Sequence, residues 1–321
     1  YTLVPVLVDP AGKLGNYTVS ITNGTLTINK APLSVVANNV SRTFGAPNLA
    51  LTGTITGIKN GENITATFAT TALQSSNVGT FAISATAVFS PATLSGNYTV
   101  TATNGTFTIT PAPLSITANN QTIILGGTVA ASATYSGFVL GQSPANLAGT
   151  LTCSATKGTG NVGSFAPPNG ISCSGQSSTN YTITFAQGTA SVQYEPAGAA
   201  CTNGPGHLIL APNSAGVGAT FAKATTPTIA VQFRVCDVKG ASVSSPVVSS
   251  FTLTSVNGVA AGTPAPVGGP FAFVGGTLAN GAGSAGWQFN LATSNLTAGN
   301  TYAYQINLND GTSISFQFKL Q

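Results

Sequence analysis

The chain has 321 residues, of which 42% are hydrophobic and only 4% are charged. The apolar content is enough for hydrophobic cores and excludes a disordered linker, and the length predicts two to four domains. The nine basic residues lie singly, so nucleic-acid binding through a basic patch is excluded. No run of about 18 apolar residues occurs, which predicts no membrane span in this segment. The chain begins at Tyr1 and contains no Met. We therefore expect a processed product or a segment of a longer protein.

Internal repeats are the most informative feature of the sequence. The stretch NYTVSITNGTLTINKAPL begins at Asn16 and recurs at Asn97 as NYTVTATNGTFTITPAPL, at an offset of 97 − 16 = 81. A weaker copy, NYTITFAQGTASV, begins at Asn180, and 180 − 97 = 83. NVGTF at Asn77 returns as NVGSF at Asn161, an offset of 84. Small insertions between these anchors are typical of loops between strands.

The repeated stretch is predicted to form strands. Val19 and Ile21, then Leu26 and Ile28, alternate with Thr and Ser, a period of two that places one apolar face against a core. Asn23-Gly24 lies between the two runs, and Asn104-Gly105 repeats it, which predicts a hairpin turn at each place. Helical periodicity is absent, and the fold class is predicted to be all-β, with tandem immunoglobulin-like β-sandwich domains.

The anchors divide the chain into successive units. Residues 1–30 are the C-terminal part of a truncated repeat, and complete repeats occupy residues 31–111 and 112–194. A Pro- and Ala-containing linker at 195–200 precedes a different β-sandwich domain at 201–321, whose last two strands meet at an Asp310-Gly311 turn. The truncated repeat would expose an unpaired edge, so we expect its missing half to lie upstream or to come from another chain.

The repeats resemble the bacterial MBG ("mostly beta, glycine-rich") domains. The GNYTV and NGTxTIxxAPL endings and the VGTF anchor carry this resemblance over about 190 residues. It implies a place in tandem arrays of large secreted or surface proteins of adhesin type, with no catalytic residues to transfer.

The C-terminal portion, from Cys201 to Gln321, resembles the PxKF domain. The stretches GHLILAPN, TPTIAVQFRVCDVKGASV and YAYQINLNDGTSISFQFKL carry the resemblance. The residues from Ala230 to Phe233 read AVQF where Pro-x-Lys-Phe is expected. The resemblance implies a terminal domain of a large extracellular bacterial protein.

The four cysteines permit three disulfide pairings. We favour Cys153 with Cys173 and Cys201 with Cys236, because each pair then lies within one predicted domain. Closing a loop of 20 residues would stabilise the fold by about 3 kcal/mol, and disulfides would require an oxidising, extracytoplasmic compartment. Four buried free thiols are the alternative. No C-x-x-C pair occurs, and the chain has a single His, so neither a metal site nor a cofactor is predicted.

The chain offers few side chains that could act as catalytic acids or bases, namely a single His and five carboxylates. A hydrolase triad would recruit His207 with a carboxylate such as Asp237, but no G-x-S-x-G motif is present, and we expect His207 to be a strand residue with a local hydrogen bond. The five carboxylates lie in at least three predicted units, so a glycosidase pair is not expected. We expect Asp310 to act in its turn and Asp237 to lie near Arg234 or Lys239. The chain is predicted not to be an enzyme.

Two kinds of surface position are candidates for modification or binding. Sequons that could carry glycans begin at Asn16, Asn23, Asn39, Asn63, Asn97, Asn104, Asn120, Asn180 and Asn295. Turns that place Asn before Thr-rich strands produce the same pattern without any glycan. Trp287 is a candidate for stacking on a sugar, and so are Tyr17, Tyr98 and Tyr181. Recurrence at equivalent positions favours core packing for the tyrosines, and the place of Trp287 beside Gly286 and before a QFNL strand favours core packing for it too.

These observations favour a structural protein, located outside the cell or at its surface. The leading hypothesis is a stalk or filament-forming subunit that polymerises with copies of itself by strand complementation, or that joins other surface components. The alternative is an adhesin that binds glycans or surfaces through its C-terminal domain. Ice or mineral binding by Thr-rich faces is a third hypothesis, for which ordinary strand solvation is the better explanation.

Overall fold

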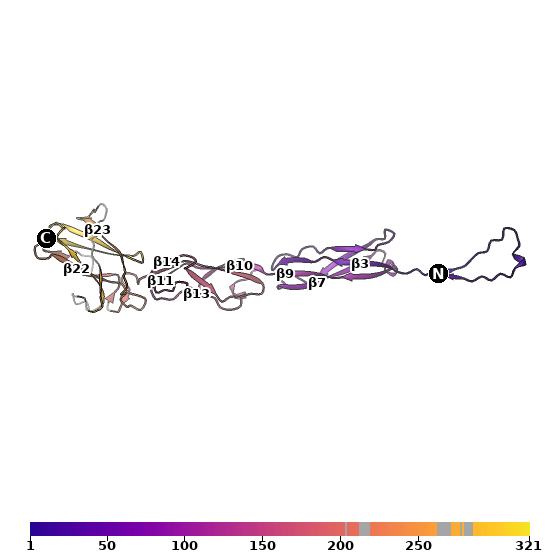
Figure 1. Ribbon diagram of the computed structural model, residues 1–321, viewed down its shortest axis with the longest axis horizontal. Helices are drawn as coiled ribbons and strands as arrows, with labels where there is room; N and C mark the ends of the chain where they lie inside the picture. Colours follow the sequence, from indigo (N-terminus) through magenta and orange to yellow (C-terminus); the bar gives the residue numbers. More distant parts are fainter. Residues whose placement is uncertain (203, 212–218, 262–270, 277, 279–284) are drawn as a thin grey trace. The chain divides into compact units, whose positions relative to one another are not determined.

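A computed structural model describes residues 1–202, 204–211, 219–261, 271–276, 278 and 285–321, and nearly every element in it is a β-strand (Figure 1). The last two residues of the GHLILAPN stretch therefore lie outside the described residues. The chain divides into two compact units. One contains residues 1–112, 139–141 and 179–182, and the other contains residues 113–138, 142–178 and 183–321. The fold class is all-β, as predicted.

The first repeat is a two-layered β-sandwich. Its elements are β3 (Ala31–Ala37), β4 (Val40–Thr43), β5 (Gly53–Thr56), β6 (Ile64–Thr70), β7 (Gly79–Phe89), the 3-10 helix η2 (Ala92–Asn97), β8 (Tyr98–Thr103) and β9 (Gly105–Thr110). The strands form one sheet in the order β5-β3-β8 and another in the order β4-β9-β7-β6. Alternating residues are buried between the sheets, among them Leu33, Ile83 and Phe107.

The first two strands of the repeat bind its last two strands in parallel. β8 pairs with β3, so that Tyr98 lies beside Ala31, and β9 pairs with β4, so that Phe107 lies beside Val40. β8 therefore depends on the opening strand β3, more than 60 residues earlier in the chain, for its hydrogen bonds, and β9 lies between the opening strand β4 and the antiparallel strand β7. A parallel pair of this kind cannot form locally and needs a long connection.

The predicted Asn-Gly hairpins are wrong. β8 and β9 do not pair with each other but lie in different sheets, and Asn104-Gly105 crosses from one sheet to the other. Neither residue has a positive φ. In the N-terminal segment (residues 1–30), Gly24 pairs with Leu3 and likewise forms no hairpin turn. Two apolar runs that face a core from opposite sheets alternate in the same way as the two strands of a hairpin, so the pattern alone does not separate these cases.

Glycine is required at the crossing because the backbone of the opening strands approaches it closely. A Cβ atom at Gly105 would lie 2.7 Å from the carbonyl oxygen of Asn38, and one at Gly188, the equivalent residue of the second repeat, would lie 2.3 Å from that of Ala118. The side chain of Asn39 accepts a hydrogen bond from the backbone N–H of Thr106 at 2.8 Å. Residues 38 and 39, where the chain crosses between the sheets from β3 to β4, thus pack against the crossing from β8 to β9, and we call the two the nested crossings.

The second repeat has the same topology. Its elements are β10 (Ala112–Ala118), β11 (Gln121–Ile124), β12 (Ala133–Ser136), the 3-10 helix η3 (Pro144–Asn146), β13 (Thr152–Ala155), β14 (Gly163–Phe165), β15 (Ile171–Ser174), β16 (Tyr181–Ala186) and β17 (Ala190–Gln193). The sheets run β12-β10-β16 and β11-β17-β14, with β13-β15 as an additional pair. Cys153 and Cys173 face each other on β13 and β15 and form a disulfide, which is the favoured pairing.

The C-terminal domain (residues 201–321) is a larger sandwich. Its strands are β18 (Ala200–Cys201), β19 (Gly204–Pro205), β20 (Leu208–Ala211), β21 (Ala219–Phe221), β22 (Thr228–Arg234), β23 (Val248–Val256), β24 (Val259–Ala260), β25 (Ala272–Val274), β26 (Gly286–Ala292), β27 (Thr301–Leu308) and β28 (Ser313–Leu320). One sheet has the order β20-β22-β26-β25 and the other β21-β28-β27-β23-β24.

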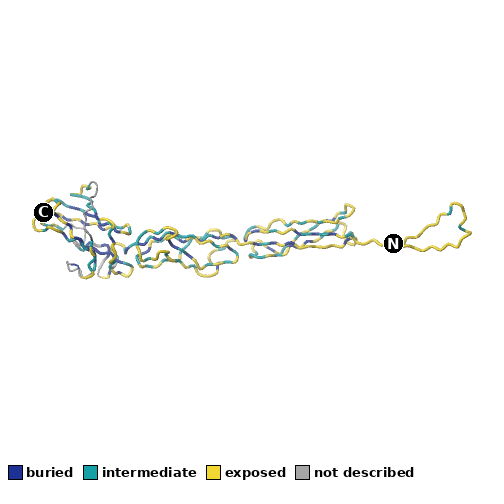
Figure 2. Tube along the Cα trace, viewed as in Figure 1, coloured by how far each residue is buried: buried dark blue, intermediate teal, exposed yellow. Residues whose placement is uncertain are grey.

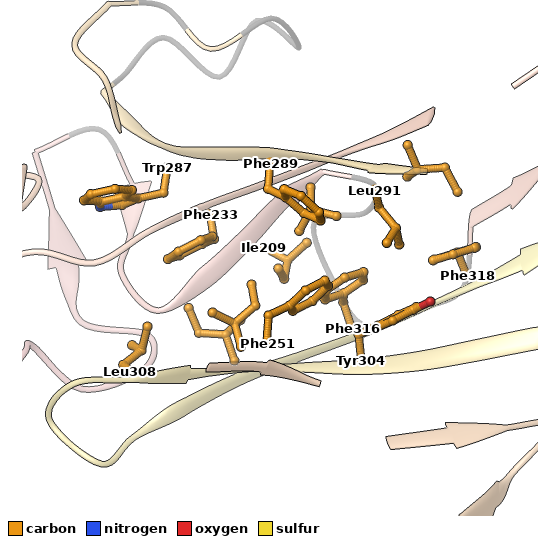
Figure 3. Close-up of a cluster of buried hydrophobic side chains, with 14 of the residues drawn as sticks. Ile209, Phe233, Phe251, Trp287, Phe289, Leu291, Tyr304, Leu308, Phe316 and Phe318 are labelled. Atoms are coloured by element: carbon orange, nitrogen blue, oxygen red, sulfur yellow. The ribbon is translucent and has the colours of Figure 1, made fainter. Parts of the chain in front are cut away.

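Aromatic side chains fill the core of this domain (Figure 3). The ring of Phe251 stacks on Tyr304 with centroids 5.2 Å apart and meets Phe289 edge-to-face at 5.5 Å. β27 and β28 meet at the predicted Asp310-Gly311 hairpin, where Gly311 has a φ of 86°. The second disulfide joins Cys201 to Cys236, again as favoured, and Gly206 lies so close that a Cβ atom there would approach the Cys201 sulfur to 2.8 Å.

The N-terminal segment contrasts with all the other parts. Its elements are only β1 (Thr2–Leu3), the 3-10 helix η1 (Leu14–Asn16) and β2 (Gly24–Thr25). Figure 2 shows this segment exposed along almost its whole length. Tyr17 is 74% exposed and Ile28 is 70% exposed, although both continue the apolar pattern of the repeats.

Two tyrosines on β27 give a test of the C-terminal core. Burial raises the pKa of Tyr304 to about 12, and its hydroxyl has no hydrogen-bond partner among the described residues. The unfolded phenol ionises near pH 10, so the folding stability that depends on the neutral hydroxyl decreases between pH 10 and pH 12. We expect Tyr304→Phe to preserve or increase stability at pH 7, within about 1 kcal/mol, and to reduce the alkaline loss.

Tyr302→Phe is the matched control. The Tyr302 hydroxyl accepts a hydrogen bond from the N–H of Thr297 at 2.6 Å and donates one to its carbonyl oxygen at 3.2 Å. Its loss should therefore cost about 1 kcal/mol at pH 7. Urea unfolding of both variants at pH 7 and pH 11 measures the difference. Equal destabilisation by the two substitutions at pH 7 would contradict the assignment.

Candidate functional site

His207 is the residue with the greatest catalytic potential, and the structure places it in a buried hydrogen-bonded cluster. Its Nε2 atom lies 2.8 Å from the hydroxyl of Thr312, which donates a hydrogen bond to Asp310 at 2.6 Å. The other carboxylate oxygen of Asp310 accepts from the backbone N–H of Tyr194 at 3.0 Å. The carboxylate linked to His207 is therefore that of Asp310, through the Thr312 hydroxyl. The carboxylate of Asp237 instead accepts hydrogen bonds from the backbone N–H groups of Lys239 and Ala241.

The order of this cluster does not suit a hydrolase. In a catalytic triad the histidine lies between the acid and the hydroxyl and removes the hydroxyl proton. In this cluster the Thr312 hydroxyl lies between His207 and Asp310 and donates its hydrogen bond to the Asp310 carboxylate. His207 itself is 9% exposed. No group of three or more His, Cys, Asp and Glu within the described part of the chain could hold a metal ion. The cluster fastens Tyr194 and His207 to the turn between β27 and β28.

The cluster predicts acid sensitivity. Burial lowers the pKa of His207, and the nearby carboxylate of Asp310 only partly opposes this effect. Because the folded state favours the neutral ring, its stabilising contribution is complete above the ordinary pKa of about 6.5 and decreases as the pH falls below it. We expect the urea midpoint of the C-terminal domain to decrease between pH 7.5 and pH 5.

His207→Asn provides the control for this prediction. Asn tolerates the positive φ of 50° at this position and does not titrate. The variant should be less stable at pH 7.5 but should lose less stability on acidification than the unsubstituted chain. An equally steep acid dependence in both proteins would assign the effect to other groups.

Trp287, the candidate for sugar stacking, is a core residue. It is 6% exposed, its ring meets Phe273 edge-to-face at 5.5 Å, and its indole N–H donates to the carbonyl oxygen of Val243 at 2.9 Å. Burial leaves no open ring face for a ligand, in agreement with the core packing that the sequence favoured for this residue. Figure 3 shows the ring at one end of the aromatic core.

The repeated tyrosines also have structural roles. Tyr98 and Tyr181 are each 4% exposed, whereas Tyr17 is exposed. The hydroxyl of Tyr98 accepts a hydrogen bond from the backbone N–H of Lys59 at 2.9 Å, and that of Tyr181 accepts one from Val139 at 3.2 Å. Both donors lie in glycine-containing turns, at residues 57–61 and 137–141, where several φ angles are positive. The tyrosine therefore braces one end of each repeat.

The sequons lie mostly on the surface. Asn16, Asn23, Asn39, Asn63, Asn97, Asn104, Asn120 and Asn295 are exposed. Asn180 is the exception, because it is half-buried and its side-chain nitrogen, the atom to which a glycan would be attached, donates to Asn77 at 2.9 Å. The side-chain oxygens of Asn39 and Asn120 accept hydrogen bonds from Thr106 and Thr189, so these two residues hold the nested crossings together.

The contacts of Asn180 belong to a joint between the two repeats. We call Phe44, Gly45, Asn77 and Val78 of the first repeat the socket, and Val139, Asn180 and Tyr181 of the second repeat the tip; all lie in the first compact unit. The side-chain oxygen of Asn180 accepts a hydrogen bond from the N–H of Val78 at 3.0 Å. The rings of Phe44 and Tyr181 meet edge-to-face with centroids 5.6 Å apart.

Gly45 makes this close approach sterically feasible. It has a φ of 80°, and a Cβ atom there would lie 2.4 Å from the Cγ2 atom of Val139. Valine is stiff about its first side-chain torsion and would not move aside without strain. The joint thus combines an aromatic contact, two amide hydrogen bonds and a glycine that admits the branched side chain of the next repeat.

The equivalent loops of the second repeat form a joint with the C-terminal domain, inside the second compact unit. Leu125 and Gly126 are equivalent to Phe44 and Gly45, and Val162 is equivalent to Val78. Leu125 and Val162 pack against the aromatic core cluster, and the carbonyl oxygen of Leu125 accepts from the N–H of Val238 at 3.0 Å. A Cβ atom at Gly126 would lie 3.7 Å from the side chain of Val238.

Residues 195–200, which the sequence predicts to be a linker, lie beside this second joint. Tyr194 is 3% exposed and belongs to the aromatic core cluster, and the N–H of Glu195 donates to the carbonyl oxygen of Cys236 at 3.0 Å. The passage into the C-terminal domain is therefore anchored on both sides of Tyr194.

The sequence analysis did not identify the socket residues. A signal for them was present, since Phe44-Gly45 and Leu125-Gly126 recur at an offset of 125 − 44 = 81. Only Gly45 and Gly126 are shared between these pairs, however, and glycine is common in this chain. That the same loop binds a different neighbour in each case could not be inferred from residue types.

Comparison with known proteins identifies the repeats. Residues 33–108 and 114–191 each match the family model of the MBG domain (YGX type), and this match includes none of the C-terminal domain, so the PxKF resemblance stays a prediction. None of the curated proteins matches the chain. The crystal structure of Drosophila N-cadherin EC1-4 aligns with 11% identity over 92% of this chain and 76% of that chain, with a TM-score of 0.19.

A second solved structure gives a similar result. Sidekick-1 immunoglobulin domains 1-4 align with 10% identity over 88% of this chain and 70% of that chain, with a TM-score of 0.17. TM-scores and identities this low carry no argument about function or partners. Finally, none of the helices within the described ranges has the length and apolar character needed to cross a bilayer.

Proposed function

We propose that this chain, which carries two tandem MBG domains of the YGX type, is a non-catalytic structural segment of an extracellular or cell-surface protein. Its role is to space and hold other parts of that protein, in the manner of a stalk. The repeats supply length, and the C-terminal domain supplies the largest core.

The observation that carries this proposal is the reuse of the socket. The loop that contains Gly45 binds the second repeat, and the equivalent loop that contains Gly126 binds the C-terminal domain. Docked joints restrict the motion between neighbouring domains, whereas free linkers of Gly and Ser would not. A chain built to transmit position or force needs this property, and an enzyme does not.

The chemistry of the surface agrees with this role. Polar hydroxyl and amide groups replace charges over most of the chain, with 4% of residues charged, so electrostatic attraction contributes little to any association. The disulfides Cys153–Cys173 and Cys201–Cys236 fit an oxidising compartment. The buried cluster around His207 stabilises the fold and offers no open site for a substrate.

Polymerisation is a competing, finer form of the proposal, in which another molecule supplies the strands that complete the N-terminal segment. The exposed apolar residues of the N-terminal segment, among them Val19, Ile21 and Ile28, are suitable for pairing as strands with a partner from elsewhere, and a homopolymer would use them in this way. The alternative adhesin function, with glycan recognition in the C-terminal domain, receives no comparable support, because Trp287 is buried. Neither glycans nor other surface components are needed to explain the contacts described above.

A matched pair of glycine substitutions tests the joints. Gly45→Ala and Gly126→Ala both place a side chain at a positive φ, 80° and 77°, so each should cost about 1 kcal/mol for the backbone alone. Only Gly45→Ala also collides with the neighbouring domain, at Val139. We expect Gly45→Ala to open the joint between the repeats and Gly126→Ala to leave that joint intact.

Hydrogen exchange measures this difference directly. The amide of Val78, which is bound to Asn180, should exchange at least about tenfold faster in Gly45→Ala than in Gly126→Ala. Small-angle X-ray scattering then tests the function, because opened joints should broaden the distribution of interatomic distances. Identical scattering and identical exchange in the two variants would refute the proposal that docked joints give the chain its stiffness.

A further inference from the structure

The N-terminal segment is equivalent, residue by residue, to the closing half of a repeat. At the offset of 81, Tyr1 corresponds to Ala82 and Lys30 to Pro111, so residues 1–30 correspond to residues 82–111. Both stretches contain a 3-10 helix just before the NYT sequence, η1 and η2. The 3-10 turn is therefore shared by the two stretches, whereas residues 1–8 contain only the short strand β1 where the equivalent residues 82–89 belong to β7.

The two stretches differ in burial. Tyr17 is 74% exposed, whereas its equivalents Tyr98 and Tyr181 are each 4% exposed. Leu26 is 46% exposed, and the equivalent Phe107 is fully buried. Ile28 is 70% exposed against 1% for Ile109. The apolar residues are those that a sandwich core requires, but the opening strands that would cover them are missing from residues 1–30.

The tip of the first repeat, formed by Lys59, Asn97 and Tyr98, also differs from its counterpart. Asn180, which corresponds to Asn97, binds Asn77 and Val78 of the preceding repeat, whereas Asn97 itself is exposed. A hollow of about 450 Å³ adjoins this tip, lined by Lys59, Asn97 and Tyr98 together with Ile28 and Lys30 of the N-terminal segment. In the joint between the repeats, Phe44 contacts the equivalent tyrosine.

These two observations point to one occupant. We propose that residues 1–30 are the closing half of a further MBG domain, whose opening half is a segment equivalent to residues 31–81, and that the socket of this domain docks on Asn97 and Tyr98. This inference deepens the proposed function, on which it rests, by naming the domain that the first repeat binds. Residues 17–21 and 25–28 would pair in parallel with the opening strands, as β8 and β9 pair with β3 and β4.

The opening half belongs to the same polypeptide as the closing half. In the first repeat, β7 runs without interruption from Gly79 to Phe89, through the position equivalent to Tyr1. A second copy of this chain would offer its own opening strands β3 and β4, but β8 and β9 already occupy them. An attached strand acts at a millimolar effective concentration and would outcompete a strand from another molecule.

The test is a fusion that supplies the opening half. A copy of residues 31–81 is joined directly to Tyr1 of the full chain, which restores a continuous repeat of 81 residues ending at Lys30 (51 + 30 = 81). We expect the amides of residues 17–28 to exchange at least about a hundredfold more slowly in the fusion than in the unfused chain. Continued fast exchange would overturn the assignment of residues 1–30 as closing strands.

Two substitutions in the fusion serve as a matched pair. Leu26→Asp places a charge at the position of buried Phe107 and should abolish the protection, whereas Thr25→Asp, at the position of exposed Thr106, should preserve it. Equal effects of the two substitutions would show that protection does not come from a sandwich core and would overturn the proposal.

Docking on the tip is tested separately. Asn97→Ala in the fusion should accelerate exchange at the copied Val78 amide while leaving residues 17–28 protected. If the copied amide exchanges rapidly even with Asn97 present, the docking surface is wrongly assigned. Concentration-dependent dimerisation of the unfused chain, abolished by Leu26→Asp, would overturn the same-chain source in favour of a second copy. All these outcomes are independent of the Gly45→Ala comparison, so a failure here is distinguishable from a failure of the proposed stiff joints.

Discussion

Parallel pairing between the two opening and the two closing strands is the constraint on which each repeat depends. β8 and β9 do not pair with each other: β8 obtains its ladder from β3, and β9 lies between β4 and β7. The crossings between the two sheets are nested so closely that only glycine fits at Gly105 and Gly188. A closing half without its opening half can neither satisfy its backbone nor cover its apolar face. The N-terminal segment, whose only paired strands are the short β1 and β2, leaves Tyr17 and Ile28 exposed.

The joints follow from the same architecture. The opening strand β4 leads directly into Phe44 and Gly45, and the closing strand β8 begins directly after Asn97, so the socket and the tip are placed at strand ends by the pairing that builds the core. A chain with so few charges cannot hold its domains in register by ion pairs. It uses amide side chains, an aromatic contact and close backbone approach instead, which are short-ranged and insensitive to salt. These contacts are suited to a structural segment whose geometry must persist in changing surroundings.

The C-terminal domain is stabilised mainly by a large aromatic core. Its core is built from aromatic rings on both sheets, with Phe251 at the centre, and the ionisable groups His207 and Asp310 meet at the β27–β28 turn. His207 and Asp310, which a search for catalytic residues would select first, are held in a cluster whose order prevents proton transfer from the hydroxyl. Both residues have a structural role, because they fasten the chain at Tyr194 and His207 to the β27–β28 turn.

The sequence by itself determined the all-β class, the repeat length and the positions of the apolar faces, because alternation and repetition are local properties of the chain. It also favoured the disulfide pairs that the structure contains. It could not determine which strands pair, since apolar runs on either side of Asn104-Gly105 fit a hairpin and a sheet-to-sheet crossing equally well. The burial of Trp287 and the joint at Gly45 were likewise decided by tertiary structure. Trp287 is buried against Val243 and Phe273, and Gly45 lies against Val139. These contacts join residues from distant parts of the chain, so no local sequence pattern predicts them.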